Sequence, residues 1–150
     1  MGSIKFFDSA HGRLLSAALK AVRRRRRRTA PEAAAALGMP LRSYEHFEAG
    51  AGRLDMAKVQ RFAGALEADP FAILTAVQIG CPEFAARCAD NKVMLALMIR
   101  LEEFNRDAGE AVADLDPALV LAEFGDAFQR LEQELRRRAR LSDPAVPYFP

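Results

Sequence analysis

Six arginines stand in a row at Arg23–Arg28, the densest charge in the sequence. Basic side chains bind polyanions because they neutralise phosphate charge and release condensed counterions. A charge run is often only a solvated helix end, where the helix dipole favours cations. Six adjacent cations exceed that need and repel one another, so the run predicts that two or three of them contact a nucleic-acid backbone. Others, such as Arg23 and Arg24, are expected to pair with acids elsewhere.

The charge is divided unevenly along the chain. Residues 1–79 hold 13 Lys and Arg against 7 Asp and Glu, a balance of +6. Residues 80–150 hold 9 against 13, a balance of −4. This division indicates that only the first half faces a polyanion, and chance segregation of surface charge is the alternative.

The polar residues offer little catalytic chemistry. The two histidines, His11 and His46, lie in unrelated contexts, and there is no glycine-rich phosphate loop, metal-ligand cluster or nucleophile with a base partner. Cys81 and Cys88 lack metal-type spacing and are expected to be small core residues in a reducing compartment. The sequence therefore predicts a protein that is not an enzyme and holds no metal or cofactor.

The hydropathy pattern contains no secretory leader and no apolar stretch that approaches 18 residues without a charge. We therefore expect no membrane partner. The predicted location is the cytoplasm, and the nucleoid when the protein is bound to DNA.

Periodicity and composition predict an all-α chain, because Ala, Leu, Arg and Glu dominate while β-branched residues are scarce. Five helices are expected in a first domain over residues 13–79. Two of them, over 30–37 and 40–49, are short and end at Gly38 and Gly50. Three helix starts are indicated by the N-cap residues Thr29, Asp55 and Asp69. Thr29 is expected to form a capping box with Glu32, and Asp69 precedes Pro70.

Residues 80–141 are expected to form a second helical domain, and residues 1–12 and 142–150 flexible or irregular termini. A helix within 82–90 is followed by one over 91–107. The latter is apolar nearly all the way round, which predicts cover on several sides. A last helix begins at Asp116-Pro117 and runs to about Arg140.

The last helix carries a heptad seam, because its large apolar residues are spaced 3-4-3-4. The seam residues are Leu121, Phe124, Phe128, Leu131 and Leu135. One interpretation is a homodimer interface, since two-fold regulators match two-fold operators. The other is packing on the 91–107 helix of the same chain.

The segment Ala30–Gly50, APEAAAALGMPLRSYEHFEAG, resembles the XRE family of Cro- and phage-repressor-like helix-turn-helix regulators, which are bacterial transcription regulators. The matching features are a small residue in the second helix, glycine and an apolar residue at the turn, and the end of the third helix. Here they are Ala34, Gly38, Met39 and Tyr44–Gly50. With the spacing of the neighbouring helices, the similarity covers nearly half of the chain.

The resemblance implies a five-helix domain that places the 40–49 helix in the major groove of double-stranded DNA. If Leu41, Tyr44 and Phe47 face inward, the outward residues are the base-reading candidates, namely Arg42, Ser43, Glu45 and His46. Arginine suits guanine, serine reaches a base or a phosphate, and glutamate accepts from cytosine. A solvated Glu45 and a plain surface His46 are the alternatives at those two positions.

Phosphate contacts fix register without reading sequence. The candidates are Arg26, Arg27, Arg28, Thr29 and Arg53. The sequence departs from the family at Ala30 and Pro31, where a polar clamp to DNA is usual, so the preceding arginines are expected to replace it. Glu48 is expected to tie the following loop by hydrogen bonds, as the matching family position implies.

The sequence therefore predicts a homodimeric repressor that binds an inverted-repeat promoter site, with C-terminal helices that also contact a protein partner. Two alternatives remain. One is a protein-interaction adaptor that kept the scaffold without reading DNA, and the other is an antitoxin-like partner protein.

Overall fold

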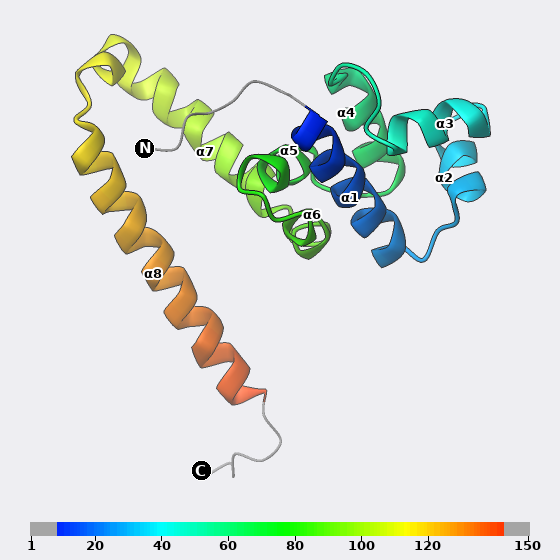
Figure 1. The fold of residues 1–150 in the computed structure, drawn as a ribbon. Coiled ribbons are helices and arrows are strands. Elements are labelled where there is room, and N and C mark those ends of the chain that lie inside the picture. The colour runs from blue at the N-terminus through cyan, green and yellow to red at the C-terminus, as the bar shows by residue number, and fades with distance from the viewer. Residues whose placement is uncertain (1–8, 143–150) are drawn as a thin grey trace. The chain divides into compact units, whose positions relative to one another are not determined.

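The computed structural model describes residues 9–142, and every regular element within that range is a helix (Figure 1). The all-α prediction is confirmed. Two compact units divide between Glu103 and Phe104, and each is described by itself. The elements are α1 (Ser9–Arg25), α2 (Ala30–Ala36), α3 (Leu41–Glu48), α4 (Met56–Ala65), α5 (Pro70–Gln78), α6 (Glu83–Arg87), α7 (Val93–Ala108), the 3₁₀ helix η1 (Gly109–Asp114) and α8 (Pro117–Leu141).

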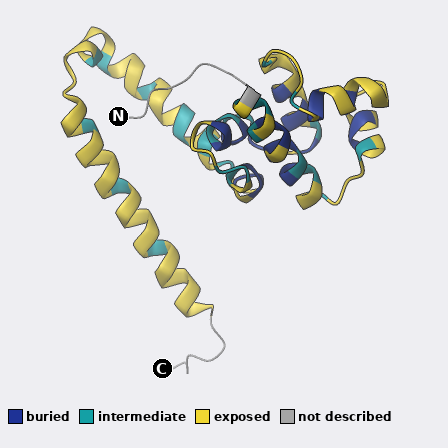
Figure 2. Cartoon of the chain, in the orientation of Figure 1, coloured by how far each residue is buried: buried dark blue, intermediate teal, exposed yellow. Residues whose placement is uncertain are grey.

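Helix α1 is the centre of the N-terminal unit and packs against α3, α5 and α6. Its apolar residues recur at three- and four-residue steps, so they fall on one face of the helix. Leu15, Leu19 and Val22 on that face are at most 5% exposed (Figure 2). Full burial of each such side chain is worth about 1.5–3 kcal/mol, which makes this face the main attachment of α1.

The N-caps that the sequence predicted are present. The Thr29 side chain accepts from the Glu32 backbone N–H while the Glu32 carboxylate accepts from the Thr29 N–H, a reciprocal capping box. Asp55 and Asp116 cap α4 and α8 in the simpler way, with one backbone N–H each. These caps satisfy donors that the first turn of a helix leaves without partners.

The core of the N-terminal unit is built from α1 to α6. Its largest fully buried apolar side chains are Tyr44, Phe62, Leu19, Ile73, Val22, Val59 and Val77. Phe47 joins Tyr44 and Phe62, with ring centroids 6.4 and 6.0 Å away. Leu41 was predicted to face inward with Tyr44 and Phe47, but it is 40% exposed because it is the first residue of α3 and extends beyond the contact with α1.

Asp69 is the one fully buried carboxylate among the described residues. Its Oδ1 accepts the N–H groups of Phe71 and Ala72 at the start of α5. Its Oδ2 accepts those of Met94 and Leu95, 2.9 and 3.0 Å away, at the start of α7. Two helix N-termini therefore share one negative charge, which their dipoles stabilise. This carboxylate fixes the first turn of α7 to α5.

The first compact unit extends past the predicted boundary at residues 79 and 80. Helix α6 packs on both α1 and α5, and its Ala85 and Ala89 belong to the same buried cluster as the core of α1. Small residues explain this arrangement, since they let α6 approach closely. At the other end, α1 begins at Ser9, so residues 9–12 are helical and not the loose lead-in that was expected. Residues 1–8 and 143–150 lie outside the described residues.

The prediction that the 91–107 helix is covered on several sides was wrong. No residue of α7 or α8 is buried in the structure, and Figure 2 shows both helices mostly as exposed. Ile99, Leu101 and Phe104 are 50%, 48% and 43% exposed. The apolar residues on which the prediction rested are present, but the described residues do not bury them.

Two glycines let α1 and the end of α3 meet. Gly50 follows α3 with a φ of +68°, and a Cβ there would collide with the carbonyl oxygen of Gly12. A Cβ on Gly12 would lie 2.8 Å from the Gly50 oxygen. Backbone approaches this close exclude any side chain, so the contact needs glycine on both sides.

Gly50→Ala should therefore lower the free energy of unfolding by about 3 kcal/mol or more, since it adds a backbone clash to the left-handed strain. Gly52→Ala is the matched control, because Gly52 also has a positive φ of +84° but a Cβ there meets nothing within 4 Å. It should cost only about 1 kcal/mol. Urea unfolding followed by circular dichroism measures both, and equal losses would refute the close-approach argument.

Candidate nucleic-acid interface

Helix α3 turns its polar side chains outward. Arg42, Ser43, Glu45 and His46, the predicted base-reading set, are all exposed. Between them Tyr44 is fully buried and Phe47 is 8% exposed. The rotation of α3 about its axis is thus set by two aromatic anchors, and the four polar residues share the opposite face.

A nearly buried ion pair fixes α3 to α1. Arg23 Nε donates to Glu48 Oε1 over 2.5 Å, and the side chains are 16% and 7% exposed. The Tyr44 hydroxyl donates to the same carboxylate over 2.9 Å. Burial, and then the hydrogen bond to Glu48, raise the pKa of Tyr44, while the Glu48 hydrogen bond raises the pKa of Arg23. The three groups form a satisfied polar cluster behind the exposed face of α3.

This cluster partly corrects the sequence analysis. Arg23 does pair with an acid elsewhere in the chain, as expected. Glu48 is structural, but the groups it binds are on α1 and within α3, not in the loop that follows. The cause is its position: the last turn of α3 points back at α1, since Gly12 and Gly50 bring those helices together.

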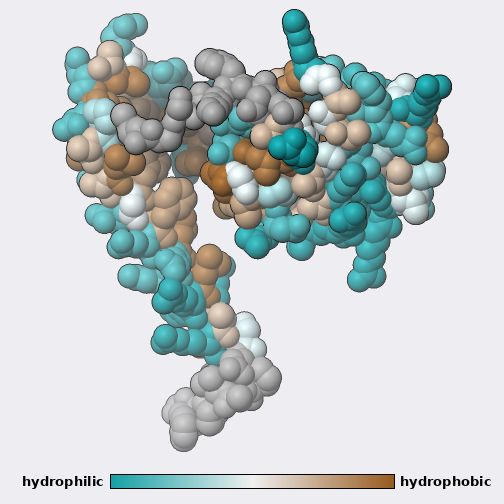
Figure 3. All heavy atoms as spheres, viewed as in Figure 1, coloured by the Kyte–Doolittle hydropathy of each residue, from teal (hydrophilic) through white to brown (hydrophobic). Residues whose placement is uncertain are grey.

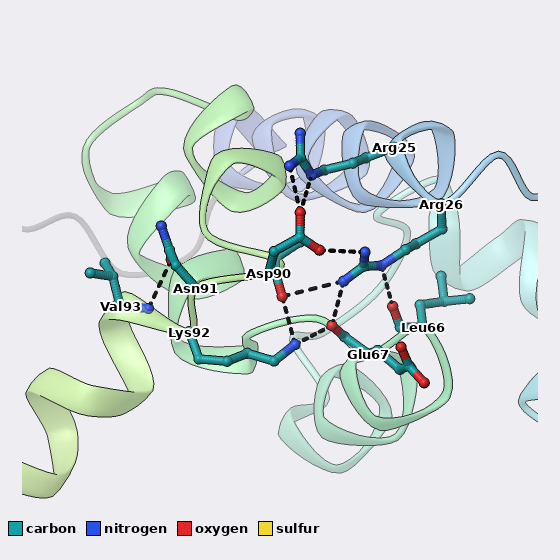
Figure 4. Close-up of polar contacts among 9 residues, drawn as sticks. Arg25, Arg26, Leu66, Glu67, Asp90, Asn91, Lys92 and Val93 are labelled. Carbon is teal, nitrogen blue, oxygen red and sulfur yellow. Dashed lines mark hydrogen bonds and ion pairs between the residues drawn. The ribbon is translucent and has the colours of Figure 1, made fainter. Parts of the chain in front are cut away.

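Arg26 was predicted to contact phosphate, but its guanidinium is occupied within the chain (Figure 4). Nε donates to the carbonyl of Leu66 over 2.8 Å, and Nη2 donates to those of Glu67 and Ala89 over 2.7 and 3.3 Å. These carbonyls lie at the C-terminal ends of α4 and α6, where no intrahelical donor reaches them. Arg26 therefore joins three helix ends, and its side chain is only 22% exposed.

Asp90 completes this cluster. It accepts from Arg26 Nη1 over 2.5 Å and from both Nε and Nη2 of Arg25 over 3.1 and 2.5 Å. The hydrogen bonds from Arg25 and then Arg26 lower the pKa of Asp90. Lys92 Nζ donates to the Glu67 and Ala89 carbonyls beside Arg26 (Figure 4). With Arg23, three of the six arginines thus serve the fold.

Other arginines of the run remain available. The side chains of Arg24 and Arg27 are exposed and make no hydrogen bond or ion pair with the described residues, and exposed Arg28 has only a weak coulombic interaction with Glu32. Arg27 has a φ of +52°, and its N–H and that of Arg28 close the end of α1 on the carbonyls of Arg24 and Arg23. Such a helix end usually takes glycine at the left-handed position.

The other two phosphate candidates differ. Thr29 donates its N–H to the Glu32 carboxylate, and its hydroxyl oxygen accepts from the Glu32 N–H, so the Thr29 backbone N–H is not directed at an external anion. Glu32 occupies that helix start, and the Thr29 N–H lowers the pKa of its carboxyl. Arg53 is exposed in the loop between α3 and α4 and has no side-chain partner among the described residues.

The structure adds one residue that the sequence analysis missed. A shallow hollow of about 530 Å³ lies beside α3. Its lining is Pro40, Arg42, Ser43, His46 and Lys58. Lys58 comes from the first turn of α4, where Asp55 accepts its backbone N–H. That cap could have placed Lys58 at the surface, but α4 was read only for its inward apolar face. The hollow brings together three of the four base-reading candidates.

The predicted seam on α8 is fully formed as a stripe. Leu121, Phe124, Phe128, Leu131 and Leu135 are 76%, 47%, 57%, 57% and 67% exposed. Figure 3 shows apolar residues exposed along this helix. Within the second unit, the described residues thus leave the seam exposed.

No protein-family model matches the chain, and no curated protein or solved structure is significantly similar to it. Among residues 9–142, no helix is long and apolar enough to cross a bilayer. The same residues contain no group of three or more His, Cys, Asp or Glu side chains placed to hold a metal ion.

The two kinds of arginine can be separated by stability. Arg26→Ala should lower the free energy of unfolding by about 2–3 kcal/mol, since it leaves the Leu66 carbonyl without its side-chain donor and removes one donor each from Asp90 and the Glu67 and Ala89 carbonyls. Arg27→Ala, one residue away, should change it by less than about 0.5 kcal/mol, as expected for an exposed side chain. Urea unfolding measures both, and a stable Arg26→Ala protein would show that the cluster contributes nothing to the fold.

Proposed function

We propose that this protein is a sequence-specific regulator of transcription that binds double-stranded DNA through a Cro- or repressor-like helix-turn-helix. In this proposal α2 and α3 form the motif and α3 enters the major groove. The observation that carries the proposal is the basic hollow beside α3. Arg42, Ser43 and His46 of α3 and Lys58 of α4 line this hollow, and the rotation of α3 is fixed from behind by the Arg23–Glu48–Tyr44 cluster.

The side chains differ in the part of DNA that they suit. Arg42 can donate two hydrogen bonds to guanine, Ser43 can reach a base or a phosphate, and His46 either. Glu45 shares the exposed face and can accept from a cytosine amino group, although it does not line the hollow. A rigid helix face is what base reading requires, because a misplaced donor loses its partner.

Phosphate contact is assigned to four exposed cations: Lys58, which lines the hollow beside α3, and Arg27, Arg28 and Arg53. Arg26 and Thr29 are removed from the set, because the fold uses the Arg26 guanidinium and the Thr29 backbone N–H. Four exposed cations without a buried partner suit the phosphate backbone, because contacts to phosphate fix the register of the protein on DNA and do not read its sequence. Such contacts make binding strongly dependent on salt concentration.

A homodimer joined through the α8 seam would present two α3 helices to the two halves of an inverted repeat. Occlusion of a promoter by that dimer is the proposed mode of repression. The protein would then act without a cofactor or catalytic step, in the cytoplasm and on the nucleoid.

A second candidate is a protein-interaction adaptor or antitoxin-like partner. The observation that favours it is the uncovered apolar surface of α7, with Ile99, Leu101 and Phe104 about half exposed. An exposed apolar surface of this kind indicates a protein contact. The two candidates are compatible if α7 binds a protein while α3 binds DNA, and they are rivals only if the chain binds no DNA.

Arg42→Ala should weaken binding to a specific site by about 1–3 kcal/mol, or roughly 5- to 150-fold, and binding to random DNA much less. The site is first selected by the wild-type protein from a pool of randomised 30-base-pair duplexes. Fluorescence anisotropy then compares the selected and random duplexes. Arg87→Ala is the control, since Arg87 is an exposed arginine on α6 and its loss changes the net charge equally.

The outcomes separate the two candidates. Equal losses on both duplexes would reduce Arg42 to a phosphate contact. Failure of the wild-type protein to enrich any sequence, with no binding of random duplex at 50 mM salt, would refute the regulator and leave the adaptor.

Phe124→Asp combined with Phe128→Asp should convert a dimer into a folded monomer, because two charges would be buried in the seam. Leu119→Asp is the matched control: Leu119 is on the same helix and 51% exposed but lies off the seam. Light scattering gives the mass and circular dichroism the fold. An unchanged mass in the double variant would place the interface elsewhere.

A further inference from the structure

Helix α8 and its two preceding acids are strongly polarised in charge. Residues 114–126 contain four acids and no base, a balance of −4. Residues 127–141 contain five arginines and two glutamates, a balance of +3. Ion pairs along the helix do not remove this excess. Glu132 pairs with Arg136, and Glu134 with both Arg137 and Arg138, which lower the pKa of Glu134 to about 2.

The seam itself offers enough area for a partner. Its five side chains are between 47% and 76% exposed and together present on the order of 600 Å² of accessible surface, or roughly 1,200 Å² for two copies. A specific interface buries about that much. Since the stripe repeats every seven residues, it fits another helix of the same repeat. A second α8 has that repeat.

The direction of pairing follows from the charges. Parallel helices would place the +3 segment of one copy beside that of the other, and likewise the −4 segments. Antiparallel helices would place each basic segment beside an acidic one, and each C-terminal end beside an N-terminal end, so that the helix dipoles also attract. Charge complementarity between the segments of two associated helices favours this orientation.

We propose that α8 binds α8 of a second copy of this chain in the antiparallel direction. The inference rests on the dimer in the proposed function and specifies its geometry. The seam permits it, because Phe124 and Phe128 lie in its middle and leucines lie at both ends. When the seam residues of two antiparallel helices interdigitate, each phenylalanine therefore packs on a phenylalanine or on a leucine of the other copy.

A glycine beside the seam agrees with this arrangement. Gly125 lies in the middle of α8, where glycine weakens a helix relative to alanine. A Cβ at that position would meet nothing within 4 Å in the single chain, so no contact inside the described structure explains it. Next to the central Phe124 and Phe128, a missing side chain lets a partner helix approach closely.

Distances between identical labels test the direction. Spin labels are placed at Gln129→Cys in one protein and at Leu141→Cys in another, in a background carrying Cys81→Ser and Cys88→Ala. Gln129 and Leu141 lie off the seam, near its middle and beyond its end. With a rise of 1.5 Å per residue, an antiparallel pair separates the two 141 labels by more than about 30 Å along the axis, and the two 129 labels by less than about 10 Å. A parallel pair gives nearly equal distances at both sites.

Electron–electron double resonance measures these distances, and circular dichroism confirms that each variant is folded. Unequal distances in the expected order support the proposal. Similar short distances at both sites would establish a parallel pair and overturn it, as would a wild-type protein that light scattering finds to be monomeric at 50 µM.

A second measurement needs no label. Screening weakens attraction between opposite charges and relieves repulsion between like ones. Raising sodium chloride from 50 to 500 mM should therefore increase the dissociation constant of the wild-type dimer several-fold, and a decrease would overturn the proposal. Duplex binding by the same samples is recorded beside it. A parallel dimer that still binds a selected duplex would refute the orientation and leave the proposed function standing.

Discussion

The N-terminal unit depends on cations at the end of α1 that find oxygen acceptors on other helices. Arg23 binds the Glu48 carboxylate of α3, while Arg26 binds carbonyls at the ends of α4 and α6. Helices as short as these have little stability alone, and their terminal carbonyls need partners. One helix end thus positions three others. The arrangement also explains why an arginine-rich segment can be partly structural and partly free within a few residues: Arg23 and Arg26 lie three apart and point into the unit.

Much of the fold was predictable from local chemistry. The starts of four helices follow from side chains at fixed offsets from the backbone they cap, as at Thr29 and Asp69, so no knowledge of distant residues was needed. The inward face of α1 followed from spacing alone. The partners of Arg26 were not predictable, because they lie 40 to 64 residues away and are mostly backbone carbonyls, which leave no trace in the sequence.

Two further differences have a common origin. The apolar character of α7 predicted cover, and the small residues of α6 gave no hint that it belongs to the first unit. Hydrophobic periodicity reports that a surface must be covered, but it does not say by which element or by which chain. For α6 the answer lay in α1 and α5, to which Ala85 and Ala89 allow close approach. For the candidate site, exposure on α3 was readable from the sequence, whereas the contribution of Lys58 required the position of α4 beside it.

The carboxylate of Asp69 has a consequence for how this chain could have been assembled from parts. Because its two oxygens are divided between the starts of α5 and α7, a fragment ending after α5 would lose two of the four backbone donors to this carboxylate. It would also uncover the surfaces of α1 and α5 on which α6 packs. A domain that is fused or exchanged as a whole therefore has to include the first turns of α7. Recombination at the glycine after α5 would yield an incomplete domain.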